Sequence, residues 1–168
     1  YADAAGRVEP DVRKRYDFGP RSNPLFPGLF ARAATAVGGS VLAAELALSG
    51  HVVFHPSGAT HPGRKDRASG FCYFNDPVFA VLTLLQGGRQ RIVYVDLEAH
   101  HGDGVEAAFE AERRVRTISI HEDRRWPHTG AAGDGVEHGA YNLPVPWGCN
   151  DSELDFLVDN VVLPLVDD

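Results

Sequence analysis

The chain has 168 residues, of which 43% are hydrophobic and 23% are charged, and its formal net charge is −7. A chain of this length can bury one sizeable core, so we expect a single domain over residues 1–168. The acidic balance and the lack of a run of Lys or Arg argue against direct nucleic-acid binding.

The cysteines and the apolar runs give indications of the cellular compartment of the protein. Cys72 and Cys149 lie far apart without CxxC spacing, which favours reduced thiols in a cytoplasmic protein over a disulfide. We find no signal peptide and no apolar run that approaches the length of a membrane span. We therefore expect a cytoplasmic protein with no membrane contact.

The first half of the chain predicts one long helix between polar segments. Residues 1–20 are polar and charged and are expected to form an arm or a long loop. The Ala- and Leu-rich residues 29–50 predict a helix that is interrupted or closely packed at Gly38 and Gly39. Residues 51–55, "HVVFH", predict a short strand, and residues 56–70 a long loop.

The second half predicts strands that alternate with helices. Residues 75–88 predict a helix capped by Asn75 or Asp76, and "RIVYVD", residues 91–96, predicts a central parallel strand because both of its faces are apolar. The remaining expected elements are a helix over 104–112, strands over 115–121 and 143–146, and an amphipathic helix over 152–166. This alternation predicts a parallel α/β sheet with helices on both faces.

A dense group of ionisable residues follows the strand at residues 91–96. In open parallel sheets, ligands bind beyond the carboxyl ends of the strands. If the chain stays extended, Asp96, Glu98 and His100 point to the same side. A carboxylate and an imidazole suit Zn²⁺ or Fe²⁺, with Asp96 as an acceptor that orients an imidazole. The alternative is that Asp103 caps the helix at Gly104 and the histidines are incidental.

Several stretches together carry a family resemblance. They are "YVDLEAHHGDGVEAAF", "ASGFCYFND", "NPLFPGLFARAATAVGGSVLAAEL", "RTISIHED", "WPHTG" and "NLPVPWGCNDSELDFLV". In this order they resemble the zinc-dependent histone deacetylase family, in particular its bacterial acetoin-utilization proteins and acetylpolyamine amidohydrolases. The resemblance covers residues 22–168 and leaves residues 1–21 outside it.

The resemblance implies a fold, an activity and ligands. The fold is the arginase/deacetylase type, a three-layer α/β arrangement with a parallel sheet and helices on both faces. The activity is metal-dependent hydrolysis of the acyl-amide of an acetyl-lysine protein or an acetylated polyamine. The implied cofactors are Zn²⁺ or Fe²⁺, with K⁺ as a monovalent ion, and a homo-oligomer is compatible with the family.

The resemblance also assigns roles to individual residues. Glu98 and His100 match metal ligands, Asp96 and Asp103 match acids that orient histidines, and His61 matches the first of two paired histidines. The narrow acyl-lysine tunnel is matched by Gly70, Phe71 and Trp126. The monovalent-cation positions are Asp96, Glu98, His100 and Ser119 for one site, and Phe109, Val115 and Tyr141 for a second.

The chain departs from the family pattern at three functional positions. The family's "GG-x-HH" reads "GATHPG", so Pro62 replaces the histidine usually assigned to proton transfer. Glu98 replaces the aspartate that is the first metal ligand, and Ser22 replaces the aspartate at the tunnel rim. The family's third metal ligand and its transition-state tyrosine are expected in segments after Asp168.

Two functions of different classes remain open. The first is an impaired metal-dependent amidohydrolase in which His61, oriented by Asp96, takes over proton transfer. The second is a catalytically degenerate deacetylase-fold protein that acts as a binding or scaffold module. A nucleophilic Cys72 paired with His61 is less favoured, because "GFCYF" is an apolar setting that raises a thiol pKa.

Overall fold

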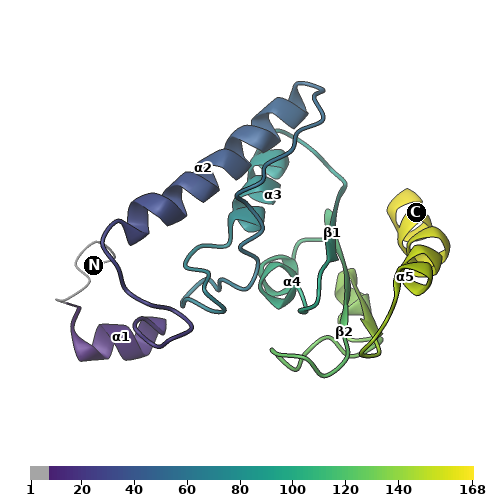
Figure 1. Ribbon diagram of the computed structural model, residues 1–168. Helices are drawn as coiled ribbons and strands as arrows, with labels where there is room; N and C mark the ends of the chain where they lie inside the picture. Colours follow the sequence, from purple (N-terminus) through teal and green to yellow (C-terminus); the bar gives the residue numbers. More distant parts are fainter. Residues whose placement is uncertain (1–7) are drawn as a thin grey trace. The chain divides into compact units, whose positions relative to one another are not determined.

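The computed structural model describes residues 8–168. It divides into two compact units, Tyr1–Gln90 and Arg91–Asp168. The helices α1, α2 and α3 belong to the first unit, and the β-sheet belongs to the second. Figure 1 labels these helices and the strands β1 and β2. The single domain expected from the sequence stays a prediction.

The first helix lies where the sequence predicted an arm or a loop. Helix α1 spans Pro10–Tyr16, so the expectation for residues 1–20 is wrong over this segment, and residues 1–7 lie outside the described part. Proline at the first helical position costs no hydrogen bond and presets φ. The charged residues that follow it are good helix formers, which the lack of apolar periodicity obscured.

Helix α2 spans Leu29–Leu48 without interruption and packs on helix α3. Gly39 is the closely packed member of the glycine pair, because a Cβ built there would lie 2.3 Å from the His55 ring. A Cβ at Gly38 would meet nothing within 4 Å. Close packing was therefore the correct alternative at Gly39.

This contrast gives a matched pair of stability predictions. We expect Gly39→Ala to lower the free energy of unfolding by about 1–3 kcal/mol, because the new methyl group overpacks the contact with His55. Gly38→Ala should raise it by up to about 1 kcal/mol through helix propensity. Denaturant unfolding monitored by circular dichroism measures both. Equal effects of the two substitutions would contradict the assigned packing.

Helix α2 also corrects an expectation about membrane segments. By length and composition alone it could cross a membrane, whereas we expected no such run; it is the one helix of this kind within residues 8–168. Core helices pass the same test. Only 17% of this apolar window is buried, and its contact with α3 includes the hydroxyl of Ser40, which donates to buried Asp76.

The segment after α2 is not a strand. Residues 51–55 form no β-ladder in the described chain, so this prediction is wrong. The β-branched side chains favour extended backbone, but a strand also needs a neighbour to pair with. Val52 and Phe54 are largely exposed, so no packing partner compensates among the described residues. The expected loop over residues 56–70 is confirmed as turns and bends.

Helix α3 confirms the predicted capping signals. It spans Asp76–Gln86, with Pro77 in its first turn and Gly87 after its last. The Oδ1 of Asn75 accepts a hydrogen bond from the Val78 N–H, which makes Asn75 the N-cap. The N-terminus of α3 is therefore fixed at the end of the loop that carries His61.

The second unit contains a parallel sheet of three strands. Strands β1 (Ile92–Leu97), β2 (Val115–Glu122) and β3 (Ala140–Val145) are all parallel in the order β1-β2-β3. The parallel pairing of β1 confirms the prediction, but its central position is wrong, because β2 is the middle strand of the described sheet. Strand β3 begins earlier than expected, and a 3₁₀ turn at Val136–His138 precedes it.

Alternation along β2 separates an apolar face from a polar one. Ile118 and Ile120 point to a core that also includes Val162. That face is covered by the predicted C-terminal helix, which is continuous through α5 (Asp151–Leu157), a π-helical turn (Val158–Val162) and α6 (Leu163–Asp167). The opposite face carries Ser119 and His121 and contacts helix α4 (Asp103–Phe109). Helical segments thus cover both faces, as predicted.

Candidate functional site

Asp96 lies near the carboxyl end of β1 and is 6% exposed. The Tyr94 hydroxyl, two residues back on the same face, donates to Asp96 Oδ2 over 2.9 Å. A Cβ on Gly102 would lie 2.6 Å from Asp96 Oδ2, so only glycine allows this close approach. The buried carboxylate is therefore held in place by its strand neighbour and by the backbone before α4.

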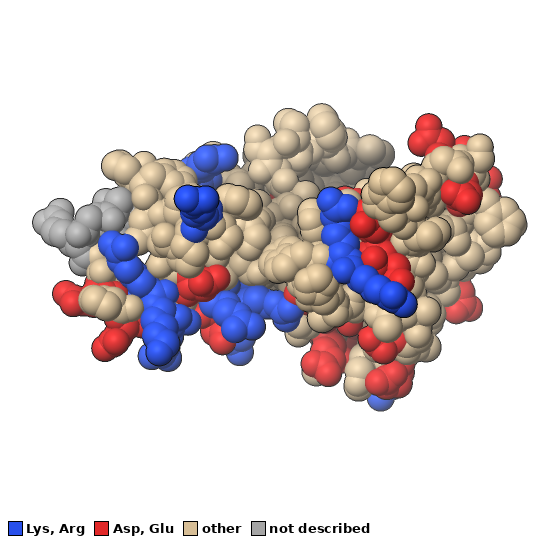
Figure 2. Space-filling model, turned by 60° about the horizontal axis from the view of Figure 1, so that its bottom comes forward, with Lys and Arg blue, Asp and Glu red and all other residues tan. Residues whose placement is uncertain are grey.

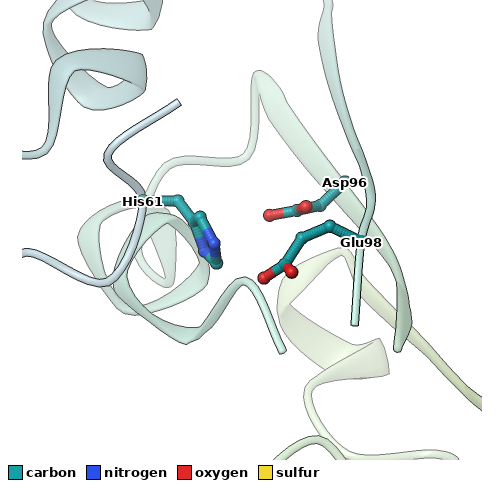
Figure 3. Close-up of side chains that lie close together, drawn as sticks. All are labelled: His61, Asp96 and Glu98. Atoms are coloured by element: carbon teal, nitrogen blue, oxygen red, sulfur yellow. The ribbon is translucent and has the colours of Figure 1, made fainter. Parts of the chain in front are cut away.

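Glu98 and His100 form a pair beyond the end of β1. His100 Nδ1 lies 3.0 and 3.2 Å from the two carboxylate oxygens of Glu98. Figure 3 shows the Asp96 and Glu98 side chains leaving the strand on the same side, and their oxygens approach within 4.8 Å. The regular strand ends at Leu97; beyond it Glu98 lies near Asp96 and bonds to His100, while the convergence of all three residues stays a prediction.

The donor atoms of this pair fit a divalent metal such as zinc. Carboxylate oxygen and imidazole nitrogen are ordinary zinc ligands, and Asp96 supplies a third oxygen nearby. However, both oxygens of Glu98 are directed at His100 Nδ1. The longer glutamate side chain thus reaches the neighbouring imidazole, and this hydrogen bond competes with metal binding.

The alternative role of Asp103 as a helix cap is wrong. Helix α4 begins at Asp103 itself, and its N-cap residue is Gly102, without a side-chain cap hydrogen bond. Asp103 is 7% exposed in the first turn, where a negative charge interacts favourably with the helix dipole. The helix also ends at Phe109, earlier than the expected 112.

A buried pair of histidines behind this turn was not anticipated. His101 and His121 are 4% and 3% exposed, and their ring centroids lie 4.7 Å apart. His101 Nε2 donates to Glu106 over 2.9 Å, and its Nδ1 lies 2.8 Å from the Thr129 hydroxyl. The signal in the sequence was the polar alternation Thr117, Ser119, His121 within an otherwise apolar strand.

The hydrogen bonds around His121 define its tautomer. His121 Nε2 faces the Gly130 carbonyl at 2.9 Å and must donate to it. The neutral ring then accepts at Nδ1 from the Ser119 hydroxyl at 3.0 Å, while Ser119 accepts from the Gly102 N–H. This directed chain connects the start of α4 to the loop that contains Trp126.

Two groups of this network have shifted pKa values. Burial lowers the pKa of His121 below its ordinary value. Burial alone raises the pKa of Glu106, but hydrogen bonds from His101 and Asn142 outweigh it, so the pKa lies below the ordinary value. The folded protein therefore favours neutral His121 and ionised Glu106.

These shifts predict a loss of stability in acid. Below about pH 6.5 an unfolded His121 binds a proton that the folded form resists, and below about pH 4.5 the same holds for Glu106. In both windows the unfolded state binds more protons than the folded state, so the free energy of unfolding should fall as the pH falls from 7.5 to about 4. Denaturant titrations at several pH values measure this. His121→Asn should weaken the dependence of the free energy of unfolding on pH, and His128→Asn, at an exposed position, should leave it unchanged. The same dependence in the His121→Asn variant and the unsubstituted protein would contradict the role of His121.

The expected tunnel residues lie in separate elements. Trp126 is 43% exposed and its ring packs edge-on against the His100 ring, with centroids 6.0 Å apart. Phe71 is 68% exposed and has a φ of 66°, a strained conformation for a bulky residue. Its N–H donates to the Ser22 carbonyl and to Asn23 Oδ1, over 2.9 and 3.1 Å, and these bonds hold the strained turn. Gly70 precedes it with a φ of 52°.

The other residues that the sequence assigned to the site lie in both units. His61 is 7% exposed and comes from the loop of the first unit, where Figure 3 labels it. Ser119 pairs with Asp96 across the β1–β2 ladder, and Phe109 and Val115 are buried at the end of α4 and the start of β2. Their roles toward a monovalent cation stay predictions. Cys72 and Cys149 are thiols, as expected.

The fold is a parallel α/β sheet with an acid–histidine pair beyond the carboxyl end of one strand, where such sheets bind ligands. The model of the histone deacetylase domain family matches residues 3–168. The chain belongs to the histone deacetylase family.

Curated relatives agree with this assignment. The chain is 38% identical to histone deacetylase 3 of Oryza sativa subsp. japonica over 89% of this chain and 30% of the relative. It is 36% identical to the acetoin utilization protein AcuC of Bacillus subtilis (strain 168), over 84% of this chain and 38% of the relative. The chain thus spans about a third of the length of these proteins.

Solved structures support the fold. A crystal structure of an HDAC homologue in complex with SAHA matches 99% of this chain and 46% of its own, with a TM-score of 0.89 and 34% identity. An HDAC homologue from Aquifex aeolicus matches 95% of this chain and 47% of its own, with a TM-score of 0.84 and 34% identity. The chain therefore has the parallel α/β fold of the arginase/deacetylase type.

Proposed function

We propose that this protein hydrolyses the acyl-amide bond of acetyl-lysine or of an acetylated polyamine in a metal-dependent reaction. The observation that carries the proposal is the Glu98–His100 pair beyond β1 in a chain of the histone deacetylase family. Glu98 and His100 would hold a zinc or iron ion, which polarises the amide carbonyl and lowers the pKa of water.

The other roles follow from the residue types. His61 accepts the proton of the attacking water, and Asp96 orients an imidazole. By the family motifs, Gly70, Phe71 and Trp126 would line the path of the substrate's methylene chain, and Ser22 would offer a hydroxyl at its rim. Asp96, Ser119, Phe109 and Val115 would contribute to K⁺ binding. Each role rests on the family motifs and can be tested by substitution of the residue concerned.

A direct test uses the natural full-length protein with added zinc. A fluorogenic acetyl-lysine peptide and an acetylated polyamine are offered as substrates, and product is followed with time. We expect slow, chelator-sensitive hydrolysis of at least one of them. No hydrolysis of either substrate at any metal concentration would overturn the proposal.

Two residues favour a second candidate, a degenerate deacetylase-fold protein that binds a partner or an acyl ligand. Pro62, which is buried, has no ionisable group at a position where the family motif has histidine. Glu98 reaches His100 rather than leaving its imidazole open. This candidate predicts binding of acetyl-lysine peptide without turnover, which the same assay combined with calorimetry separates from the first.

We expect weak metal binding whether the protein is an impaired hydrolase or a catalytically degenerate binding protein. Glu98 and His100 bond to one another, and a metal must displace that bond before it can bind both. After dialysis against a chelator-free buffer, metal analysis should find well under one equivalent of zinc. His100→Ala should remove the residual metal, and exposed His128→Ala should not. Stoichiometric zinc that survives dialysis would contradict this expectation and make Asp103 the next ligand to test.

We also propose binding partners and a cellular compartment for this protein. The expected partners are acyl-lysine proteins or acyl-polyamines, without nucleic acid, in the cytoplasm. On the face drawn in Figure 2, Lys and Arg side chains lie beside Asp and Glu side chains. Such mixing supports the exclusion of nucleic acid, because a phosphate backbone needs a continuous basic surface.

A further inference from the structure

The loop before α3 is tied to a single buried carboxylate. Asp76, the first residue of α3, is 1% exposed. Its oxygens accept the backbone N–H groups of Ala59 and Thr60 over 3.2 and 2.6 Å, together with the hydroxyl of Ser40. The Thr60 hydroxyl lies 2.5 Å from Asp76 Oδ1 and 2.7 Å from the Phe74 carbonyl, and its one proton serves one of them.

The neighbouring amide holds the other side of the same loop. Asn75 Nδ2 donates to the carbonyls of His61 and Gly63, over 2.6 and 3.0 Å. Its Oδ1 caps helix α3 through the Val78 N–H. Both N–H groups and the carbonyl oxygen of the Asn75 side chain are therefore used, and both N–H groups bond to the backbone around His61.

The loop is built to approach these two side chains closely. A Cβ on Gly58 would lie 2.8 Å from Asp76 Oδ2, and one on Gly63 would lie 3.0 Å from the Phe74 backbone. Ala59 has a φ of 72°, a left-handed conformation that a non-glycine residue keeps only when its surroundings impose it. No Lys or Arg pairs with Asp76 among residues 8–168, so loop and helix donors alone compensate its buried charge.

We propose that Asn75 and Asp76 are positioning residues that fix the backbone on both sides of His61 and thereby aim its imidazole. The inference rests on the proposed hydrolysis for its functional consequence. Asp76 holds the N–H of Thr60 immediately before His61, and Asn75 holds the carbonyl of His61 itself. The backbone is thus held by hydrogen bonds directly before His61 and at His61 itself, the residue proposed to accept the proton. Both bonds come from side chains at the start of α3.

The test is a double-mutant cycle on acetyl-lysine peptide in the natural full-length protein. Asp76→Asn and Asn75→Ser are each made with and without His61→Ala. With His61 present, kcat should fall about 100-fold, since a displacement near 1 Å costs that much, while KM changes little. With His61 absent, neither substitution should lower the residual rate further. Equal fractional losses in both backgrounds would overturn the proposal.

Two controls separate positioning from folding. Asn75→Ser keeps a side chain that caps α3, so it loses the loop contacts without the cap. Asp66→Asn makes the same chemical change as Asp76→Asn at an exposed position of the same loop and should leave kcat unchanged. A loss of kcat with Asp66→Asn as large as with Asp76→Asn would count against a specific role.

A second readout does not depend on turnover. The His61 ring resonances are followed by NMR in the unsubstituted protein and in both variants. We expect one sharp ring signal in the former and a broadened or shifted one in Asp76→Asn and Asn75→Ser. An unchanged ring signal in both variants overturns the positioning role. If the protein hydrolyses neither substrate, the proposed function fails while this readout still decides the role of Asn75 and Asp76.

Discussion

Restoring the two departing residues together should raise deacetylation far more than the product of their separate effects. Pro62→His returns an ionisable group worth about 10²–10⁴ in rate when it is correctly placed. Glu98→Asp shortens the side chain, so it no longer reaches His100 Nδ1 at 3.0 Å and leaves the imidazole open to metal. Each single change should rescue less than about tenfold, because the residues act as one unit.

The measurement is hydrolysis of a fluorogenic acetyl-lysine peptide by the natural protein, the two single variants and the double variant, with added zinc. Pro56→His places an imidazole at an exposed position of the same loop and should give no rescue. If the unsubstituted protein already turns over at about 1 per second or faster, the impaired-site interpretation is wrong, and His61 is the working base.

Truncation of Ile118 should be among the most damaging single changes to the second unit. Its side chain is fully buried on the middle strand β2, against Val162 of the C-terminal helical run. We expect Ile118→Ala to lower the free energy of unfolding by about 2–5 kcal/mol, from lost burial and from the cavity that remains. Denaturant unfolding followed by circular dichroism measures the change.

A graded series tests whether packing is the cause. Ile118→Val removes one methylene and should cost about 0.5–1.5 kcal/mol. Leu163→Ala, at a half-exposed position of the same helical run, should cost less than Ile118→Ala. A cost for Ile118→Ala below that of Leu163→Ala would contradict the burial assigned to β2.

Local signals in the sequence were sufficient where the physics is local. The cap at Asn75, the proline in the first turn of α3 and the stop at Gly87 depend on neighbouring residues only, so the helix was predicted with nearly its observed bounds. The parallel strand β1 followed from an apolar run, because both faces of such a strand are covered. The pairing of Glu98 with His100 followed from their spacing.

Long-range contacts decided the rest. Residues 51–55 have strand-forming side chains but no pairing partner in the described chain. In the described sheet β1 pairs with β2 alone and therefore lies at an edge. The spacing of the sequence could not reveal that His101 meets His121, since β2 and the Thr129–Gly130 turn bring them together.

The family, the α/β class and the residues that depart from the family motifs could be predicted from the amino-acid sequence alone, since these depend on residue identity and order. The side chains that bond to the loop around His61 could be identified only in the folded chain. Asn75 and Asp76 lie 14 and 16 residues from the groups that they bond, His61 and Thr60. Their hydrogen bonds exist because the loop folds back on the start of α3, a closure that no periodicity encodes.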